Sequence, residues 1–421
     1  MPGRDFHVTN RRKLLETLPD RSVAVFFAGE KKYVSEDWLY PFSPNRNYFY
    51  LTGLRNHGGI MMLVKYDDLE TDHLFVRRPE PRLELYKGKM NTPDEYAECT
   101  GFTNVKYLDE FPGELGGLLI HNSFQALYVD HKKRSLDDTM CQVACFINTT
   151  RNSFPAIEIR DVRPLVSKMR QIKTPEEQAL MRMAAGHTAE GVRRTVRKIA
   201  PGVYTYELYA EFEYYLRQNG LSTCAFESVI TAGKECLIIH SENYSQIKDG
   251  ETVLIDVGAE YEHYASDICR VYPASGKFTP EQRFYYNAVI EAEETIIKAL
   301  KPGFDITDIG PMGDDILIKR CRDGGILKKD EEIRKYLNHG IYHFLGLDSH
   351  DVGETDTLEP GMVISIEPGL YIEQLGLAVR VEDNILITED GNENLTAKIP
   401  KTPDEIESEM EKSPYQSSAK T

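Results

Sequence analysis

The chain has 421 residues, a formal net charge of −17, and 41% hydrophobic and 28% charged residues. This composition is that of a globular protein, and the length favours two domains over one. The negative charge argues against general binding to nucleic acid or to an anionic membrane, and no apolar run reaches the roughly 20 residues of a membrane span. The N-terminus lacks the apolar core of a secretory signal. Seven scattered cysteines without a CxxC pair predict free thiols in a reducing cytoplasm.

Residues 1–160 are expected to form the smaller domain, of α/β class. Strand-like runs of apolar and β-branched residues lie at 21–27, 60–65, 73–77 and 126–130, and a helix is predicted over 136–147. The segment 38–54 holds five Tyr or Phe residues beside Trp38, the only tryptophan. This aromatic segment belongs either to the core or to a surface that covers another subunit or the mouth of a site.

A connecting segment at 159–173 leads into a larger domain, expected over 161–411, and residues 412–421 form a Ser-rich tail that is predicted to be disordered. A strand is predicted at 225–231. Helices are predicted over 175–199, 205–218, 280–300, 305–322 and 402–411. The fourth of these contains Pro311 and Gly313, which predicts a kink or two short pieces.

The stretch 249–271 reads as a β-hairpin around which the larger domain is built. An apolar strand at 252–256 ends in Asp256, a turn begins at Gly258, and the returning strand carries Asp267. A carboxylate among apolar strand residues is unfavourable unless it is paired, protonated or bound to a metal. The two acids are therefore either solvated or the start of a divalent-cation site.

A second copy of this pattern occupies 360–388. Aligning Asp256 with Glu367 also aligns Gly258 with Gly369, and the second returning strand carries the acid Glu382. The repeat extends upstream, because Thr174 and Thr279 each precede a proline and have Glu or Gln three positions later, which predicts two capping boxes. We infer an internal duplication. If its halves face each other about a pseudo-two-fold axis, four acids converge on one centre.

Three of the eleven histidines fall within twelve residues, at His339, His343 and His350. On a helix the first two would share one face, as in zinc-binding HxxxH pairs. Flanking glycines and the absence of a helical apolar repeat favour an extended or looped segment instead. Neutral imidazole is a good ligand for Mn, Co, Fe or Zn, and carboxylates suit Mn and Mg. Four acids and one histidine therefore fit a binuclear site for a fairly hard divalent ion.

The order Asp256, Asp267, His343, Glu367 and Glu382 resembles the five-ligand signature of the pita-bread metallopeptidases. The local sequences LIDVGAEY, HFLGLDSHDVG, LEPGMVISIEPGLYI and VRVEDNILIT are most similar to the proline-specific branch, and within it to the aminopeptidase P family. The resemblance covers about 165–411 strongly. It covers the N-terminal part, which is similar to the creatinase-type domain of the same branch, more weakly.

The resemblance implies a role for each matching position. Asp256 would bind the first metal alone, Asp267 and Glu382 would bridge both metals, and His343 and Glu367 would complete the second. Four further residues match positions that hold the substrate or stabilise the transition state: His240, His339, His350 and Arg380.

The expected chemistry agrees with this set of residues. Two cations lower the pKa of a water molecule and polarise the scissile carbonyl, and Glu367 would carry the proton to the leaving nitrogen. An X-Pro bond has no N–H, and His240 or His350 is a candidate donor to the developing oxyanion. Arg380 and Glu382 are two residues apart and should share a face. The alternative for Arg380 is charge compensation of the acids.

One position departs from the family pattern. Relatives usually carry Thr two residues after the bridging Asp267, whereas this chain has Cys269. By strand alternation the thiol should face the metals, where it could tune the site or add a soft ligand. A further hypothesis is that it makes the activity sensitive to oxidants.

The resemblance thus predicts an α/β (α+β) chain in which a creatinase-like N-terminal domain precedes a pseudo-two-fold pita-bread catalytic domain. It implies a Xaa-Pro aminopeptidase with two divalent ions, Mn²⁺ before Co²⁺ or Zn²⁺, acting on peptides with proline second, as a cytoplasmic homodimer or homotetramer. The alternative is a prolidase, which cleaves only X-Pro dipeptides and often has longer insertions where this chain has only 354–359. A non-catalytic peptide-binding protein or a metal-independent creatinase-like hydrolase is disfavoured because all five ligand positions are filled.

Overall fold

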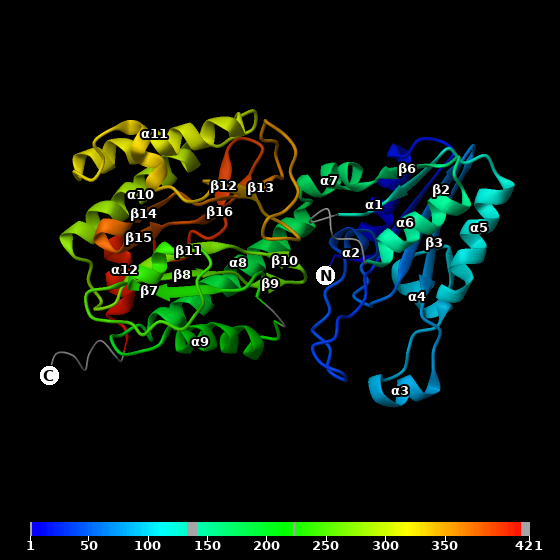
Figure 1. The fold of residues 1–421 in the computed structure, drawn as a ribbon, viewed down its shortest axis with the longest axis horizontal. Coiled ribbons are helices and arrows are strands. Elements are labelled where there is room, and N and C mark those ends of the chain that lie inside the picture. Colours follow the sequence, from blue (N-terminus) through cyan, green and yellow to red (C-terminus); the bar gives the residue numbers. More distant parts are fainter. Residues whose placement is uncertain (1, 133–140, 222–223, 414–421) are drawn as a thin grey trace. The chain divides into compact units, whose positions relative to one another are not determined.

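The computed structural model describes residues 2–132, 141–221 and 224–413. The chain divides into two compact units, Met1–Met169 and Arg170–Thr421, whose helices and strands are labelled in Figure 1. Most of the predicted tail, residues 414–421, lies outside the described residues. Among those described, no helix combines the length and the apolar composition needed to cross a bilayer.

The first unit is built on a mixed six-stranded sheet with the order β4-β3-β2-β1-β5-β6. Strand β1 pairs antiparallel with β2 and parallel with β5, and all four predicted strands are confirmed. Strands β4 and β6 were not predicted, because their sequences NVKY and EIRD carry too few apolar residues to stand out. The strands are β1 (Ser22–Phe27), β2 (Ile60–Tyr66), β3 (Leu69–Val76), β4 (Asn104–Tyr107), β5 (Ala126–Val129) and β6 (Glu158–Asp161).

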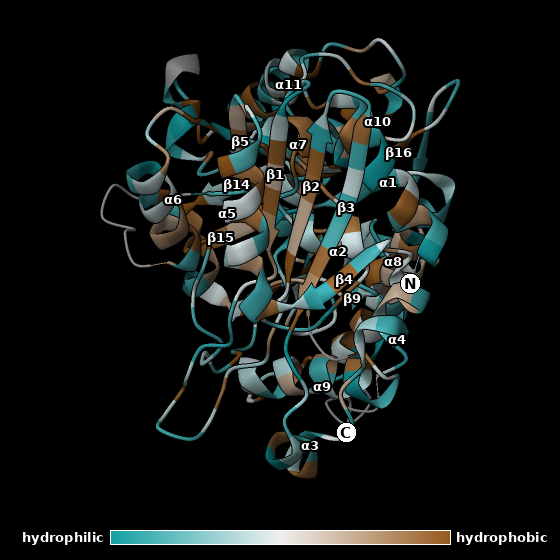
Figure 2. Cartoon of the chain, turned by 90° about the vertical axis from the view of Figure 1, so that its right-hand side faces the viewer, coloured by the Kyte–Doolittle hydropathy of each residue, from teal (hydrophilic) through white to brown (hydrophobic). Residues whose placement is uncertain are grey.

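Helices complete this unit and bury the centre of the sheet. Every residue of β1 is buried, and Figure 2 shows β1 and β2 as predominantly hydrophobic. The aromatic segment is divided: Tyr48, Phe49 and Tyr50 are buried, whereas Trp38 is 68% exposed. The helices are α1 (Arg4–Thr17), α2 (Arg46–Thr52), α3 (Pro81–Lys87), α4 (Pro93–Thr100), α5 (Phe111–His121) and α6 (Gln142–Ser153), with a 3₁₀ turn at Leu108–Glu110. The predicted helix 136–147 overlaps α6, but residues 136–140 lie outside the described residues.

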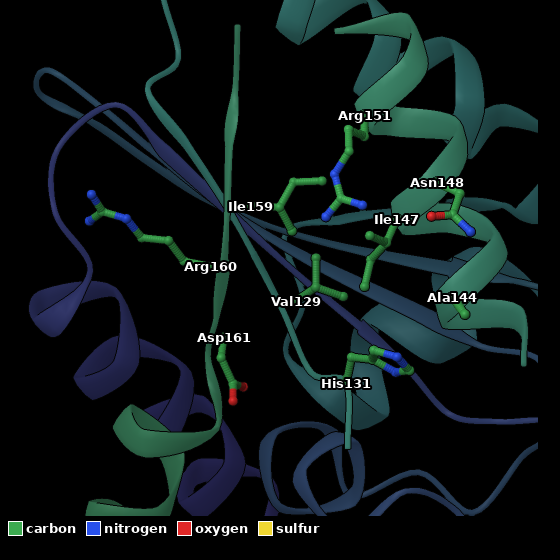
Figure 3. A pocket seen from close by; sticks show the side chains of 9 residues that line it. All are labelled: Val129, His131, Ala144, Ile147, Asn148, Arg151, Ile159, Arg160 and Asp161. Carbon is green, nitrogen blue, oxygen red and sulfur yellow. The ribbon is translucent and has the colours of Figure 1, made fainter. Parts of the chain in front are cut away.

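A cavity of about 280 Å³ lies between β5, β6 and α6 of this unit. Figure 3 shows Ile159 turned toward it and Arg160, the next residue on β6, directed away, as strand alternation requires. The guanidinium of Arg160 is held instead by Glu158 and Tyr128. None of the predicted catalytic or metal-binding residues lines this cavity.

The second unit begins within the last turn of α7 (Arg163–Gln171). Two helices follow, and they pack on a three-stranded sheet, β11-β8-β7. The predicted hairpin is confirmed, and its register places Cys269 opposite Asp256. The strand predicted at 225–231 is shifted, since pairing begins only at Val229. The elements are α8 (Pro175–Val196), α9 (Thr205–Gln218), β7 (Val229–Ala232), β8 (Thr252–Val257), β9 (Glu260–Tyr261), β10 (Tyr264–Ala265) and β11 (Ile268–Pro273), with a 3₁₀ turn at Gly233–Leu237.

The second half of this unit repeats the order of helices followed by strands (Figure 1). It forms a four-stranded sheet, β12-β13-β16-β17, and a two-stranded sheet, β14-β15. Pro311 lies in the first turn of one unbroken helix, α11, where no intrahelical N–H is lost. The elements are α10 (Pro280–Ala299), α11 (Ile309–Asp323), β12 (Tyr342–Phe344), β13 (Val363–Ile366), β14 (Gly369–Ile372), β15 (Leu377–Arg380), β16 (Asp383–Ile387), β17 (Asn392–Asn394) and α12 (Pro403–Met410), with 3₁₀ turns at Ile306–Asp308, Asp330–Lys335 and Glu373–Leu375.

Both predicted capping boxes are present. Thr174 accepts a hydrogen bond from the N–H of Glu177, whose carboxylate accepts one from the N–H of Thr174, and Thr279 and Gln282 are arranged in the same way. One continuous apolar core includes residues of α8, β8 and β11 from the first half and of α10, β14 and β15 from the second. The two halves are therefore joined by their packing, which brings the two hairpins to one centre.

His7 makes the stability of the first unit depend on pH. Burial lowers the pKa of His7 from 6.5 to about 4, so the folded imidazole stays neutral while the unfolded one takes up a proton below pH 6.5. Stability should therefore fall as the pH is lowered from about 6.5 toward 4, by about 2 kcal/mol at pH 5 from this group alone. Because His7 Nδ1 lies 3.0 Å from the carbonyl oxygen of Tyr50, His7→Asn offers a comparable donor without the titration.

The measurement is hydrogen exchange of the β1 amides at pH 7 and pH 5 in both proteins. We expect the loss of stability between the two pH values to be about 2 kcal/mol smaller in His7→Asn. Equal losses in the two proteins would show that His7 does not set this dependence.

Candidate metal centre

The structure brings the five predicted ligands together from five places in the second unit. Asp256 lies on β8, and Asp267 lies between β10 and β11. His343 is on β12, Glu367 follows β13, and Glu382 directly precedes β16. All five are buried or nearly so, with side-chain exposures of 3–15%.

The imidazole of His343 lies at the middle of this group. Its Nε2 is 3.5 Å from Glu382 Oε1, 3.7 Å from Asp267 Oδ2 and 3.7 Å from Glu367 Oε1. Donor atoms of Asp267, His343 and Glu382 all lie within 4.8 Å of one another. Two atoms bound to one cation at about 2.0–2.2 Å are roughly 3–4.4 Å apart, so these spacings fit a shared ion.

Asp256 is paired with Arg380, the residue at the end of β15. The guanidinium donates to Asp256 Oδ2 through Nη2 and to the Tyr371 hydroxyl through Nη1, the latter at 3.2 Å. The second oxygen of Asp256, Oδ1, is buried without a hydrogen-bond partner among the described residues. An orphaned carboxylate oxygen at this depth is unfavourable, and a cation would satisfy it.

The raised pKa values of the acids also indicate a site for a cation. Burial raises the pKa of Asp256 to about 7, and burial with the nearby charge of Glu382 raises the pKa of Glu367 to about 8. Burial and the charges of Glu382 and Asp256 raise the pKa of Asp267 well above its usual range. These groups resist ionisation together because water is excluded and like charges are close. Divalent cations supply the charge that would let them ionise.

Glu382 and His343 behave differently from the other members of the centre. Burial opposes the charge of Glu382, but contact with the His343 imidazole outweighs it and lowers the pKa of Glu382. Burial likewise opposes the imidazolium, yet Glu382 and Glu367 raise the pKa of His343 to about 9. The positive charge of a protonated His343 therefore balances the surrounding acids as a cation would. Metal binding to His343 would release this proton.

Three further histidines were predicted near the site, and two lie close to the ligands. His339 Nδ1 is 3.3 Å from Glu367 Oε2, and burial with the Arg380 charge lowers the pKa of His339 to about 4. The rings of His350 and His343 are 4.4 Å apart. His240 follows the 3₁₀ turn at Gly233–Leu237 and is exposed, and its charge acts on His350.

The loop carrying His350 is anchored by a buried ion pair. Asp351 accepts a hydrogen bond from Arg170 Nη2 at 2.5 Å, and its other oxygen lies 3.1 Å from Lys173 Nζ. The carboxylate of Asp351 and the lysine are each 1% exposed. This pairing fixes the backbone next to His350, and the sequence pattern did not reveal it because the partners are about 180 residues apart in the chain.

Two glycines allow the close approach of backbone and side chains around the centre. A Cβ on Gly258 would lie 1.8 Å from the carbonyl oxygen of Ser266, and one on Gly369 would lie 2.8 Å from His339 Nε2. Any larger residue would push the acid-bearing strands apart at Gly258 or displace the histidine at Gly369. These are the two glycines that the repeat aligns.

Two polar residues beside the ligands were not predicted. Ser365 donates a hydrogen bond to Glu382 Oε1 at 2.6 Å, and Asn384 bonds to the backbone of Asp267. A signal was available in the sequence, because Ser365 lies two residues before Glu367 and Asn384 two after Glu382, which places each on the ligand's face of the strand. Polar residues in otherwise apolar strands next to ligands could have been recognised from this spacing.

Comparison with known proteins gives this geometry a context. Residues 179–389 match the model of metallopeptidase family M24, and residues 7–128 match that of the aminopeptidase P N-terminal domain. The Xaa-Pro aminopeptidase of Escherichia coli K12 is 34% identical, with 95% of this chain and 96% of the relative covered. The chain belongs to metallopeptidase family M24.

Other members of the M24 family support the same assignment. The Xaa-Pro aminopeptidase of Haemophilus influenzae is 32% identical, with 97% of this chain and 98% of the relative covered. The solved structure of aminopeptidase P from E. coli with the inhibitor Pro-Leu matches at a TM-score of 0.90 and 33% identity, covering 97% of this chain and 98% of that one. The mixed α/β fold with an aminopeptidase P N-terminal domain and an M24 catalytic domain agrees with the expected class, and the chain is a metallopeptidase.

The Cys269 thiol lies next to this centre, as predicted, but its surroundings do not favour oxidation. The side chain is fully buried, beside Arg380 and Asp256. Burial raises the pKa of Cys269 well above its usual value, whereas oxidation requires an accessible thiolate. The structure therefore counts against the hypothesis of an oxidant-sensitive centre.

Peroxide should modify the exposed thiols Cys99 and Cys145 before Cys269. Peptide mass spectrometry after graded exposure gives the order of oxidation, and Cys269→Thr serves as the matched variant. We expect the parent and Cys269→Thr to lose activity at the same rate. Early sulfenic acid at Cys269, or protection of activity in the variant, would contradict this expectation.

Proposed function

We propose that this metallopeptidase is a Xaa-Pro aminopeptidase, which hydrolyses the bond between an N-terminal residue and a following proline. The observation that carries the proposal is the convergence of three donor side chains, Asp267, His343 and Glu382, beside Glu367. Relatives of nearly the same length are named Xaa-Pro aminopeptidase, and an aminopeptidase P of this fold takes Pro-Leu as an inhibitor.

The five side chains would hold two divalent ions. Asp256 would bind the first ion, Asp267 and Glu382 would bridge the two, and His343 and Glu367 would complete the second. Carboxylate oxygens with one imidazole suit Mn²⁺, and Co²⁺ or Zn²⁺ could occupy the same donors. The orphaned Oδ1 of Asp256 and the raised pKa values of Asp256 and Glu367 support the assignment.

The residues around the ions have separate tasks in the reaction. When bound, the two cations activate a water molecule and polarise the scissile carbonyl. Glu367 accepts the proton of the attacking water and delivers it to the prolyl nitrogen, which must be protonated to leave. His339 lies close enough to orient this carboxylate. Arg380 compensates the charge of Asp256. The hydrogen bond from Arg380 to the Tyr371 hydroxyl fixes the guanidinium.

The histidines at the edge of the centre would act on the substrate. The ring of His350 lies beside that of His343, where a donor can reach an oxyanion that forms on the carbonyl. His240 is exposed and close enough to His350 for their charges to interact. We assign both to substrate positioning or transition-state stabilisation.

The decisive assay compares two peptides that share the same first residue. Metal-reconstituted enzyme is offered Xaa-Pro and Xaa-Pro-Xaa in parallel, with Xaa-Ala-Xaa as the control for proline specificity. We expect release of the first residue from Xaa-Pro-Xaa. Cleavage of the dipeptide alone would identify a prolidase, and no cleavage of either peptide with Mn²⁺, Co²⁺ or Zn²⁺ would contradict the proposal.

Replacing Glu367 tests its role as proton carrier. Glu367→Gln removes the group that accepts a proton, and kcat should fall by about 10²–10⁴-fold. Glu373→Gln is the matched control, because Glu373 is an exposed acid in the 3₁₀ turn that links β14 and β15. Metal content is measured on both variants, so that loss of an ion is separated from loss of proton transfer. Full activity in Glu367→Gln would exclude Glu367 from this role.

We also propose a homodimer or homotetramer in the cytoplasm. The first unit exposes three large apolar side chains: Trp38 (68% exposed), Leu85 (86%) and Tyr86 (78%). Subunit contacts commonly cover side chains of this kind. The seven cysteines are free, which suits a reducing compartment.

A further inference from the structure

The buried amide of Asn384 connects the two hairpins that carry the ligands. Asn384 is on β16 of the second half and is 1% exposed. Its Oδ1 accepts hydrogen bonds from the Asp267 N–H and the Ser266 hydroxyl, both at 3.0 Å. Its Nδ2 donates to the carbonyl oxygen of the same Asp267. One side chain of the second half thus holds both backbone polar groups of a ligand in the first half.

Asp267 needs such a partner because of its place in the chain. It lies between β10 and β11, outside the paired residues of both strands, and it is 5% exposed. Its N–H and C=O would otherwise be buried without partners, which is unfavourable for each group. A primary amide offers a donor and an acceptor side by side, which suits the N–H and the C=O of one residue.

The same amide is linked to the second bridging acid through Ser365. In the ladder of β12, β13 and β16, His343 is opposite Ser365, and Ser365 is opposite Asn384. Directly opposed residues share one face of a sheet. Asn384 Nδ2 donates to the Ser365 hydroxyl at 3.5 Å, and that hydroxyl donates to Glu382 Oε1 at 2.6 Å. The row therefore reaches the backbone of Asp267 in the first half and the carboxylate of Glu382 in the second.

We propose that Asn384 and Ser365 are positioning residues that set the geometry of the two bridging carboxylates, Asp267 and Glu382. The pair touches no substrate. Asn384 fixes the backbone from which Asp267 extends, and Ser365 fixes Glu382 Oε1, the carboxylate oxygen that lies 3.5 Å from His343 Nε2. This inference rests on the proposed binuclear centre. It assigns to these two residues the relative placement of ligands that come from different halves of the duplication.

The test uses the full chain and measures uptake of Mn²⁺ alone. Titration followed by the EPR signal of free Mn²⁺ gives the number of sites and their affinities. Asn384→Ala and Ser365→Ala should each weaken at least one site by about 10–100-fold, the usual effect of removing a group that orients a metal ligand. Ser365→Thr keeps the hydroxyl and should restore the affinity.

Asn392 supplies a matched control on the same sheet. Its Nδ2 donates to the carbonyl oxygens of Ile297 and Leu300 at 2.8 and 2.9 Å. Neither bond reaches a candidate metal ligand. Asn392→Ala therefore removes an amide with two backbone contacts and should leave Mn²⁺ affinity unchanged. Thermal unfolding without metal measures the structural effect of each variant separately from its effect on the ions.

The outcomes separate this inference from the proposed function. Unchanged Mn²⁺ affinity in both Asn384→Ala and Ser365→Ala would overturn it, as would an equal loss in Asn392→Ala. Because Ser365→Ala removes a single oxygen, it remains informative if Asn384→Ala fails to fold. If the parent binds two Mn²⁺ with the expected variant effects but cleaves no Xaa-Pro peptide, the proposed function fails and this inference stands. A parent that takes up no Mn²⁺ would overturn this inference, whereas the proposed function would still be decided by peptide cleavage with Co²⁺ or Zn²⁺.

Discussion

The enclosure of four carboxylates around one imidazole is the constraint on which the second unit depends. Asp256, Asp267, Glu367 and Glu382 lie where water is largely excluded, and bringing like charges together in such a place is strongly unfavourable. The acids stay together because the rest of the second unit holds them in place, through its strands, its helix caps and a common apolar core. The repulsion is balanced by protons on some groups, by Arg380 on another, and by divalent cations when they bind.

A second buried ionic cluster joins the halves directly behind this centre. Arg270 on β11 donates through Nη1 to the carbonyl oxygens of Cys269 and Glu382, at 2.9 and 2.6 Å, and through Nη2 to Asp383 at 2.5 Å. Asp383 also lies 3.3 Å from Lys401. Removing one member of such a group costs about 3–5 kcal/mol, because a charge is left buried without a partner. The backbone carbonyls of Cys269 and Glu382 are thereby fixed.

The sequence was sufficient to predict the five residues that converge on this centre, because two hairpins share a local, repeated pattern and the five positions resemble a known ligand signature. An acid at the end of an apolar strand, a glycine turn and a second acid recur in both hairpins, and the capping boxes at Thr174 and Thr279 recur upstream of them. Interactions between distant segments could not be predicted in this way. The pairing of Asp351 with Arg170 spans 181 residues, and strand β4 has no pattern that distinguishes it from a loop. Tertiary contacts decide both.

The duplication explains why the centre is symmetric in its carboxylates but not in its histidine or its supporting contacts. Each hairpin brings two acids, so a two-fold arrangement of carboxylates follows from the repeat alone. The supporting side chains come mainly from the second half: Arg380 pairs with Asp256, Asn384 holds Asp267, and three of the four histidines lie on β12 and its flanks. Ligands are constrained by the ions they share, whereas the residues around them are free to diverge. The second half thus supplies the charge compensation of Asp256, while the first half adds Arg270, which holds the backbone of Glu382.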